Sequence, residues 1–110
     1  MWTPDSTIIM TAQQKAAAAQ AALMASFQSA IQTHVDQAAV AKLYNDGNAL
    51  AGYVNSTVPQ WSSEAQAFVA WRDAVWLYAY AELDKVQTGQ RPVPTVDEFL
   101  AELPEIEWAE

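Results

Sequence analysis

The strongest periodic pattern lies between residues 62 and 88, where apolar side chains recur every three or four positions. This spacing predicts a helix from Ser62 or Ser63 to about Thr88, with Gly89 as its stop and Ser63-x-x-Gln66 as a capping box. Its stripe comprises Ala65, Phe68, Val69, Arg72, Val75, Trp76, Ala79, Leu83 and Val86. Additional large residues, which are Trp71, Leu77 and Tyr78, widen the stripe. A helix this apolar is predicted to be central, with an aromatic face left for a partner.

An Ala- and Gln-rich segment, residues 11 to about 33, predicts a first helix with Thr11 as its N-cap. Its larger apolar residues are spaced three to four apart and are Leu23, Met24, Phe27, Ile31 and Val35. Before Leu23 this face holds only Ala, which contributes little burial. The first half of the helix is therefore expected either to pack closely against another helix or to project from the domain.

A second helix is predicted from about residue 37 to residue 54, with Asp36 as its cap. Its apolar face comprises Val40, Leu43, Tyr44, Leu50, Ala51 and Val54. The turn signal Asn45-Asp46-Gly47 lies inside this range. Either the helix breaks there, or it continues and tolerates the Gly at a cost of about 1 kcal/mol.

Two proline-containing links divide the rest of the chain. Residues 55–61 connect the second and third helices, and Pro92 with Pro94 forms a stiff link after the third. Thr95-x-x-Glu98 is a capping box that predicts a short helix over about 96–103, ended by Pro104. The predicted fold is all-α: a small antiparallel bundle of three main helices plus this short C-terminal helix, in a single domain over residues 11–110.

Residues 1–10 show no helical period and are predicted to form an extended N-terminal arm. Pro4 and Asp5 suggest a turn within it. Trp2, with the β-branched Ile8 and Ile9, is either an anchor for docking onto a partner or a cover for the domain's own core.

Composition narrows the range of partners. Thirteen acids against five Lys and Arg give a formal charge of −8, the opposite of the basic footprint of a nucleic-acid-binding protein. Anionic membranes should also repel the chain, and no apolar run reaches the roughly 20 residues of a membrane span. Only 16% of residues are charged, which is low for a soluble monomer and predicts an oligomer or a larger assembly.

Candidate chemistry is sparse. The chain has no Cys and one His, so neither a zinc site nor a Ser-His pair is expected, and no cofactor is predicted. His34 is interpreted as a residue near a helix end. Arg72 is expected to stack on Trp71 or Trp76 or to pair with a carboxylate. The expectation is a protein that is not an enzyme.

One motif points to a family. Glu64, Ala65, Ala67, Trp71, Arg72, Asp73, Val75 and Trp76 form the pattern E-A-x-A-x-x-x-W-R-D-x-V-W after a short Ser/Pro/Trp link. Pro94, Thr95, Phe99, Leu100, Leu103, Pro104 and Trp108 continue it as P-T-x-x-x-F-L-x-x-L-P and a late Trp. Over residues 34–108 the chain thus resembles small tailed-phage proteins of tail and tail-fibre gene regions, of the tail-fibre assembly or tail assembly chaperone type. The resemblance implies a phage setting and a protein partner, and transfers no catalytic residue.

The expected function is binding to another phage tail or tail-fibre protein, in the virion tail, in the host cytoplasm or in both. The candidate partner-binding residues are Trp2, Ile8, Ile9, Leu23, Phe27, Trp71, Arg72, Trp76, Tyr78 and Trp108. The alternative is an acidic inhibitor that mimics nucleic acid and blocks a host defence protein. That alternative rests on six acids without a base near the C-terminus, which are Asp97, Glu98, Glu102, Glu105, Glu107 and Glu110.

Overall fold

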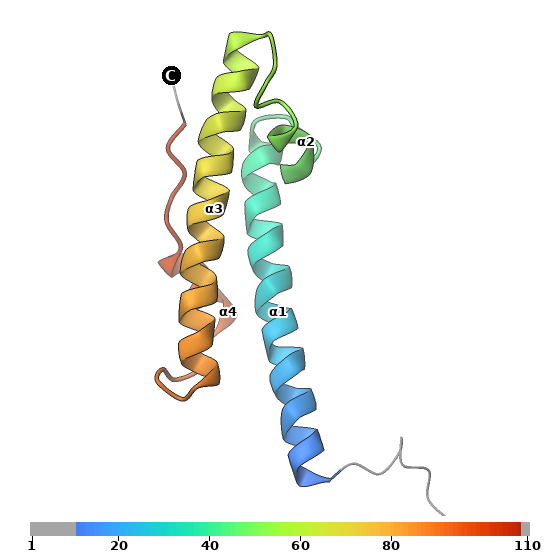
Figure 1. Cartoon of the computed structure of the whole chain (residues 1–110), viewed down its shortest axis with the longest axis vertical. Coiled ribbons are helices and arrows are strands. Elements are labelled where there is room, and N and C mark those ends of the chain that lie inside the picture. Colours follow the sequence, from blue (N-terminus) through green and yellow to red (C-terminus); the bar gives the residue numbers. More distant parts are fainter. Residues whose placement is uncertain (1–10, 109–110) are drawn as a thin grey trace, which may run out of the picture.

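The computed structural model describes residues 11–108, and the regular secondary structure in this part of the chain is all helical, with no strand. The predicted all-α class is therefore confirmed. The predicted extended arm, with Trp2, Ile8 and Ile9, lies outside the described residues, as does Glu110. Two long helices and two short ones replace the predicted three main helices plus one (Figure 1).

The first helix, α1 (Ala12–Ala41), starts where it was predicted to start. Thr11 forms a complete capping box with Gln14, whose backbone N–H donates to the Thr11 hydroxyl at 3.0 Å. The helix does not end near residue 33, and Asp36 caps no second helix. Buried Phe27, Ile31 and the later Val35 and Ala39 continue one i, i+4 row through this region. Because the segment contains no Gly or Pro, nothing interrupts that row.

The break in the predicted second helix lies at residues 42–46. The short helix α2 (Gly47–Ala51) begins after Asp46, whose side chain accepts from the Ala49 N–H at 2.8 Å. Asp36 instead links two helices, because its carboxylate accepts from the backbone N–H of Gly47 at 2.9 Å. The Asn45-Asp46-Gly47 signal therefore starts a new helix.

α1 ends in a Schellman motif. The N–H of Leu43 donates to the carbonyl of Val40 at 2.9 Å, and the N–H of Tyr44 reaches back to the carbonyl of Ala39 at 3.1 Å. This hydrogen-bond pattern requires a left-handed residue at the first position after the cap. Leu43 supplies it with a φ of 72°, the one non-glycine residue with positive φ among residues 11–108.

The second long helix, α3 (Pro59–Gln87), begins earlier than predicted. Pro59 occupies the first turn, where its missing N–H costs nothing. Ser62 therefore lies inside the helix, and the predicted Ser63–Gln66 capping box is wrong. The Ser62 hydroxyl instead donates to the carbonyl of Val54 at 3.0 Å. The C-terminal end is close to the prediction, with Thr88 as cap and Gly89 at a φ of 76°.

The last helix, α4 (Val96–Glu102), has the predicted capping box between Thr95 and Glu98. Figure 1 shows α1 rising and α3 descending beside it, with α2 at the end where they are joined. The segment after α4 runs back along α3. Fully buried side chains fill the centre and are Phe27, Phe68, Phe99, Ile31, Leu50, Val35 and Val75.

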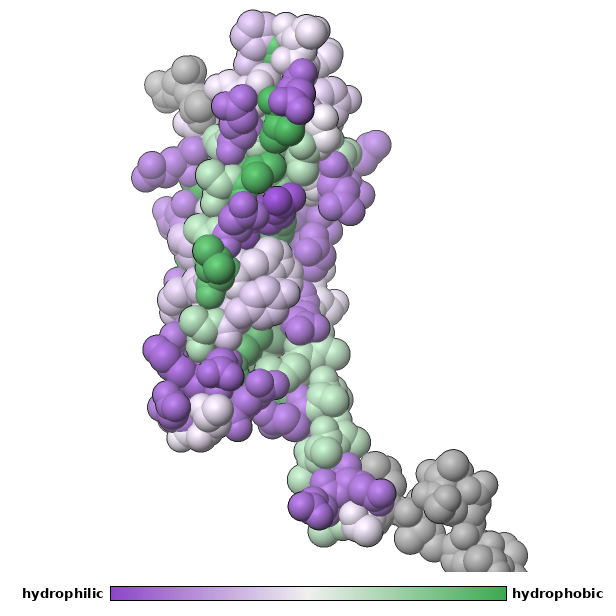
Figure 2. Space-filling view, in the orientation of Figure 1, coloured by the Kyte–Doolittle hydropathy of each residue, from purple (hydrophilic) through white to green (hydrophobic). Residues whose placement is uncertain are grey.

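The first turns of α1 contribute no side chain to this buried core. Residues 11–19 are all exposed, and the first buried side chain is Met24. Figure 1 shows this part of α1 extending beyond the end of α3, and Figure 2 shows it covered largely by the pale green of alanine. The first large apolar side chains of α1 therefore lie at the point along the helix where α3 starts to run beside it (Figure 1).

An ion-pair cluster holds the link after α3 against both neighbouring helices. Arg91 donates to Glu82 of α3 at 2.9 Å and also to Glu102 of α4. Lys85 lies 2.7 Å from the same Glu82. Tyr78 donates its hydroxyl hydrogen to Glu102 at 2.7 Å. α4 is therefore attached through polar bonds as well as through its buried Phe.

This cluster predicts how stability depends on pH. Hydrogen bonds from Arg91 and then Tyr78 lower the pKa of Glu102 below its ordinary 4.5, and the hydrogen bond from Lys85 lowers the pKa of Glu82. Their contribution is present above that ordinary pKa and is lost as the pH falls through the lowered folded value. The hydrogen bond to Glu102 raises the pKa of Tyr78 above 10.0, so its contribution is lost at still higher pH.

We therefore expect urea unfolding to give a free energy that falls below about pH 4.5 and above about pH 10. Glu102→Gln should flatten part of the acid decrease, whereas Glu107→Gln, at an exposed position, should not. Equal acid slopes for the wild type and Glu102→Gln would show that this cluster does not contribute.

Candidate partner-binding surfaces

Two of the candidate partner-binding residues belong to the core. Phe27 is 1% exposed and meets the ring of Phe99 edge-on at 5.3 Å. Trp71 is 7% exposed, and its indole N–H donates to the carbonyl of Pro104 at 2.7 Å. The prediction that Trp71 belongs to an exposed aromatic face is wrong, because the segment after α4 covers it.

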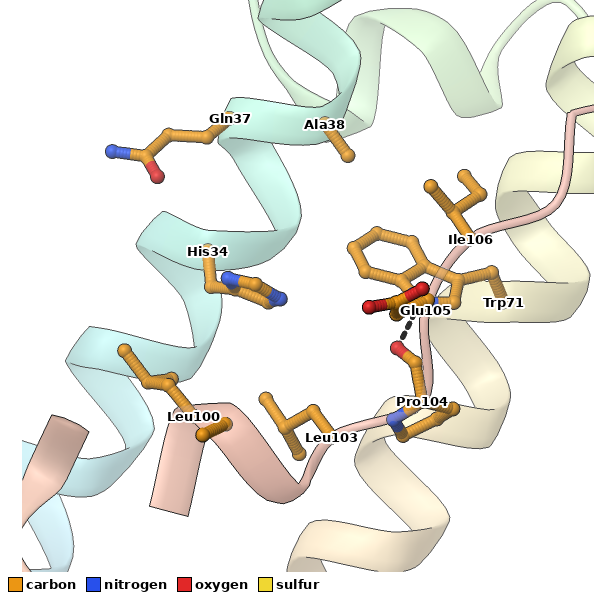
Figure 3. Close-up of a pocket in the computed structure, with 10 residues that line it drawn as sticks. His34, Gln37, Ala38, Trp71, Leu100, Leu103, Pro104, Glu105 and Ile106 are labelled. Atoms are coloured by element: carbon orange, nitrogen blue, oxygen red, sulfur yellow. Dashed lines mark hydrogen bonds between the residues drawn. The ribbon is translucent and has the colours of Figure 1, made fainter. Parts of the chain in front are cut away.

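A hollow of about 520 Å³ borders Trp71 (Figure 3). His34 of α1 faces the indole across it, with ring centroids 5.8 Å apart. Its remaining walls are formed by Gln37 and Ala38 of α1 and by residues 100, 101 and 103–106, which are apolar except for Glu105. The hydrogen bond from Trp71 fixes the chain at Pro104, so this hollow is a packing seam between α1 and the C-terminal segment.

Three further candidates are half-buried contacts with the rest of the chain. Leu23 and Trp108 pack against the core, and the Lys42 ammonium lies 4.9 Å from the centre of the Trp108 ring. Tyr78 is bonded to Glu102 and faces Phe99 at 6.3 Å. Their contacts within the chain give them structural roles.

Arg72 and Trp76 lie on an open surface that we call the α3 aromatic face, made of Arg72, Trp76, Leu77 and Tyr80. The rings of Trp76 and Tyr80 are 5.4 Å apart and tilted by 33°. Tyr80 is 59% exposed and Leu77 is 73% exposed. Arg72 pairs with the adjacent Asp73 at 3.1 Å, one of the two predicted alternatives.

A hollow of about 690 Å³ adjoins this face on the side of α1. Ala25, Gln28, Ser29 and Gln32 of α1 form its other wall. The walls therefore combine two aromatic rings with the uncharged, mostly polar side chains of α1 and one guanidinium. Such a mixture suits a protein surface with both apolar and hydrogen-bonding groups.

A second open surface, which we call the end patch, lies where α1, α2 and α3 meet. It comprises Val40, Leu43, Tyr53 and Trp61, all exposed. The ring of Tyr53 lies 5.5 Å from that of Tyr44 and 5.7 Å from that of Trp61. The pattern of residues 37–54 had placed Val40 and Leu43 on a buried helix face, which is wrong: the buried row of α1 runs through Val35 and Ala39, which leaves Val40 outside, and Leu43 lies beyond the end of α1 at Ala41.

The end patch borders a hollow of about 550 Å³. At its base Glu64 is nearly buried, accepts from the Tyr44 hydroxyl at 3.1 Å and lies 3.5 Å from Lys42. Burial and this hydrogen bond raise the pKa of Tyr44. The charges at this hollow are therefore matched within the chain. The sequence did not predict that Leu43 is exposed, although Asn45-Asp46-Gly47 signalled that the helix could end nearby.

The carboxylates of the acidic C-terminal region fall into two groups, those bonded within the chain and those that are exposed. Glu98 completes the cap of α4, and Glu102 is bonded to Arg91 and Tyr78. Glu105 and Glu107 are exposed. The region therefore presents fewer free carboxylates than its sequence suggests.

Within residues 11–108, no group of three or more His, Cys, Asp or Glu side chains is arranged to hold a metal ion. In the same range, none of the helices has the length and apolar character needed to cross a membrane. Neither a protein family, nor a curated protein, nor a solved structure matches this chain.

Proposed function

We propose that this chain is a phage tail-associated protein that binds another virion protein, as a component of the tail or tail fibre or as an assembly factor. The observation that carries the binding function is the α3 aromatic face, with Trp76 and Tyr80 in contact and exposed Leu77 three residues before Tyr80 on the helix. Trp, Tyr and Arg are the residue types that most often dominate binding energy at protein interfaces. The W-R-D-x-V-W resemblance supplies the phage setting.

In this proposal α1 and α3 form an antiparallel pair that presents the face. Trp76 is half-buried, so its ring is held in place before the partner arrives. A side chain that is already ordered loses little conformational freedom on binding. The partner is expected to place an apolar side chain in the adjoining hollow of about 690 Å³.

The partner is expected to copurify with the chain as a tail or tail-fibre protein from infected cells or from purified particles. Mass spectrometry of particles tests whether the chain stays in the virion. A chain that is found in neither fraction and copurifies with no virion protein would contradict the proposal.

Replacing Tyr80 or Trp76 by Ala is expected to weaken this complex by about 2 kcal/mol or more each, roughly 30-fold in Kd, because each change removes one of the two aromatic rings of the face. Titration calorimetry with the copurified partner measures the loss. Val93→Ala, an exposed apolar change away from this face, is the matched control and should bind normally. Wild-type affinity in both aromatic variants would exclude the α3 aromatic face.

The acidic-inhibitor alternative predicts the opposite response to salt. Affinity carried by carboxylates should fall steeply with ionic strength, whereas affinity carried by Trp76, Leu77 and Tyr80 should change little. Because Glu98 and Glu102 are engaged within the chain, the binding face on α3 is the better supported of the two. A Glu105→Gln, Glu107→Gln variant separates them, since only the alternative predicts that it binds more weakly.

A further inference from the structure

Leu43 occupies a position for which leucine is poorly suited. The Schellman motif at the end of α1 puts it in the left-handed region, with a φ of 72°. Gly is the usual residue there, followed by Asn, because a Cβ crowds the following carbonyl in this conformation. The branched side chain of leucine therefore makes the end of the helix less stable than Gly would.

Within residues 11–108 the side chain gains almost no burial to offset that cost. Leu43 is 95% exposed, more than any other large apolar residue described. A leucine that is costly in its backbone conformation and open to water is explained if a surface outside this chain covers it. An observed backbone outlier of this kind is a reason to look for a function.

The same end of the molecule has a hollow suited to accept a leucine side chain. Leu43 stands at the rim of the hollow of about 550 Å³, whose walls include Tyr53 and Trp61. These aromatic side chains are themselves 38% and 45% exposed. One surface thus holds both a protruding aliphatic side chain and a hollow with aromatic walls and a paired Lys42 and Glu64.

A surface that holds both halves of a contact is self-complementary. In a two-fold dimer each subunit uses the same patch, so Leu43 of one copy can enter the hollow of the other, and the reverse. Charge permits this approach even though the chain carries a formal charge of −8. The charged side chains lining the hollow, Lys42 and Glu64, are paired with each other at 3.5 Å.

We propose that the occupant of the end patch is a second copy of this chain, in an isologous dimer in which Leu43 is the central contact. The dimer would carry two α3 aromatic faces, so a partner could be bound at two points. The proposal stands independently of the proposed function, because it uses different residues.

The patch is smaller than the roughly 20–30 residues per side of a stable interface. The expected dimer is therefore weak, with a Kd on the order of 10 μM to 100 μM. Sedimentation velocity over a concentration series is the suitable measurement, with the full chain and no partner present. The sedimentation coefficient of the wild type should increase with concentration.

Leu43→Gly and Leu43→Asn are the decisive variants. Both replacements tolerate positive φ, so each should fold at least as well as the wild type at low concentration and remain monomeric throughout the series. Leu77→Gln is the matched control, since it removes another exposed leucine, from the α3 aromatic face. The Leu77→Gln variant should dimerise normally and bind the virion partner more weakly. The Leu43→Gly variant should bind that partner at its α3 aromatic face with the affinity of a single wild-type site.

An isotope-filtered nuclear Overhauser experiment on a mixed labelled and unlabelled sample locates the contact. Signals between the Leu43 methyl groups of one copy and the Tyr53 or Trp61 ring of the other are expected. A wild type that is still monomeric at about 1 mM would overturn the proposal, and a partner that covers Leu43 in its place would give that result. A dimer that survives Leu43→Gly would overturn it equally.

Discussion

Replacing Phe99 by Ala is expected to lower the free energy of unfolding by about 3–5 kcal/mol. Phe99 is fully buried and meets the ring of Phe27 edge-on at 5.3 Å. The Arg91 guanidinium lies 5.5 Å from the centre of the same ring. Removing the ring leaves a cavity between α1 and α4 and removes the surface on which Arg91 lies. Such a loss is a large part of the roughly 5–15 kcal/mol by which small domains are stable.

Urea unfolding followed by circular dichroism measures this change. Val93→Ala is the control, because Val93 precedes α4 in the chain but is exposed, and its loss should stay within about 0.5 kcal/mol. Similar losses in the two variants would mean that α4 does not pack through Phe99.

Replacing Gly47 by Ala is expected to destabilise the chain by about 1–3 kcal/mol, although Ala favours helices more than Gly does. A Cβ at this position would lie 2.9 Å from the Asp36 carboxylate oxygen and 3.0 Å from the tip of the Phe68 ring. Phe68 is fully buried, so its ring has no free space to move into. Asp36 would have to retreat from its hydrogen bond with the Gly47 N–H.

Gly52→Ala is the matched control, because the same substitution falls at the other end of α2. There the nearest atom to a new Cβ is the Ala49 carbonyl oxygen at 3.4 Å, an ordinary contact, and φ is −66°. We expect this variant to be more stable by about 0.4–1 kcal/mol, since Ala restricts the unfolded chain. If both variants shift the urea midpoint in the same direction, the close approach at Gly47 is not the cause.

Local signals in the sequence were sufficient for the start of α1, the end of α3 and both ends of α4. Thr11 and Thr95 each stand at the start of a helix with a Gln or Glu three residues later, and both capping boxes are formed. Gly89 lies just beyond α3 with positive φ, as its position suggested. These ends depend on residues close together in the chain, which is why the pattern alone could predict them.

Other helix ends depend on contacts that no local pattern contains. Asp36 resembles an N-cap in sequence, but its carboxylate binds Gly47 eleven residues later. Ser63 resembles a cap as well, yet Pro59 had already started the helix. A cap residue within an uninterrupted row of apolar positions therefore carries little information by itself.

The candidate surface was only partly predictable for a related reason. The width of the apolar stripe on α3 indicated that two sides of the helix are covered or bound, but not which element covers which side. Trp71 is covered because the chain returns to it at Pro104, 33 residues later. Trp76 stays half-buried and Tyr80 exposed, because the residues of α1 on their side are Ala, Ser and Gln, and a hollow remains between them. Leu43 became visible only through its φ and its exposure.

The bare start of α1 acts as a spacer of adjustable length. Thr11 stands about 18 Å along the helix axis from Leu23, the first large side chain that packs against the core, at about 1.5 Å per residue. Since no large side chain between them is buried, adding or deleting residues there should leave the folded body unchanged. Each residue would alter the reach by that rise and rotate whatever is attached by about 100°. The distance and the rotation of a group attached at this end can therefore change without disturbing the buried core.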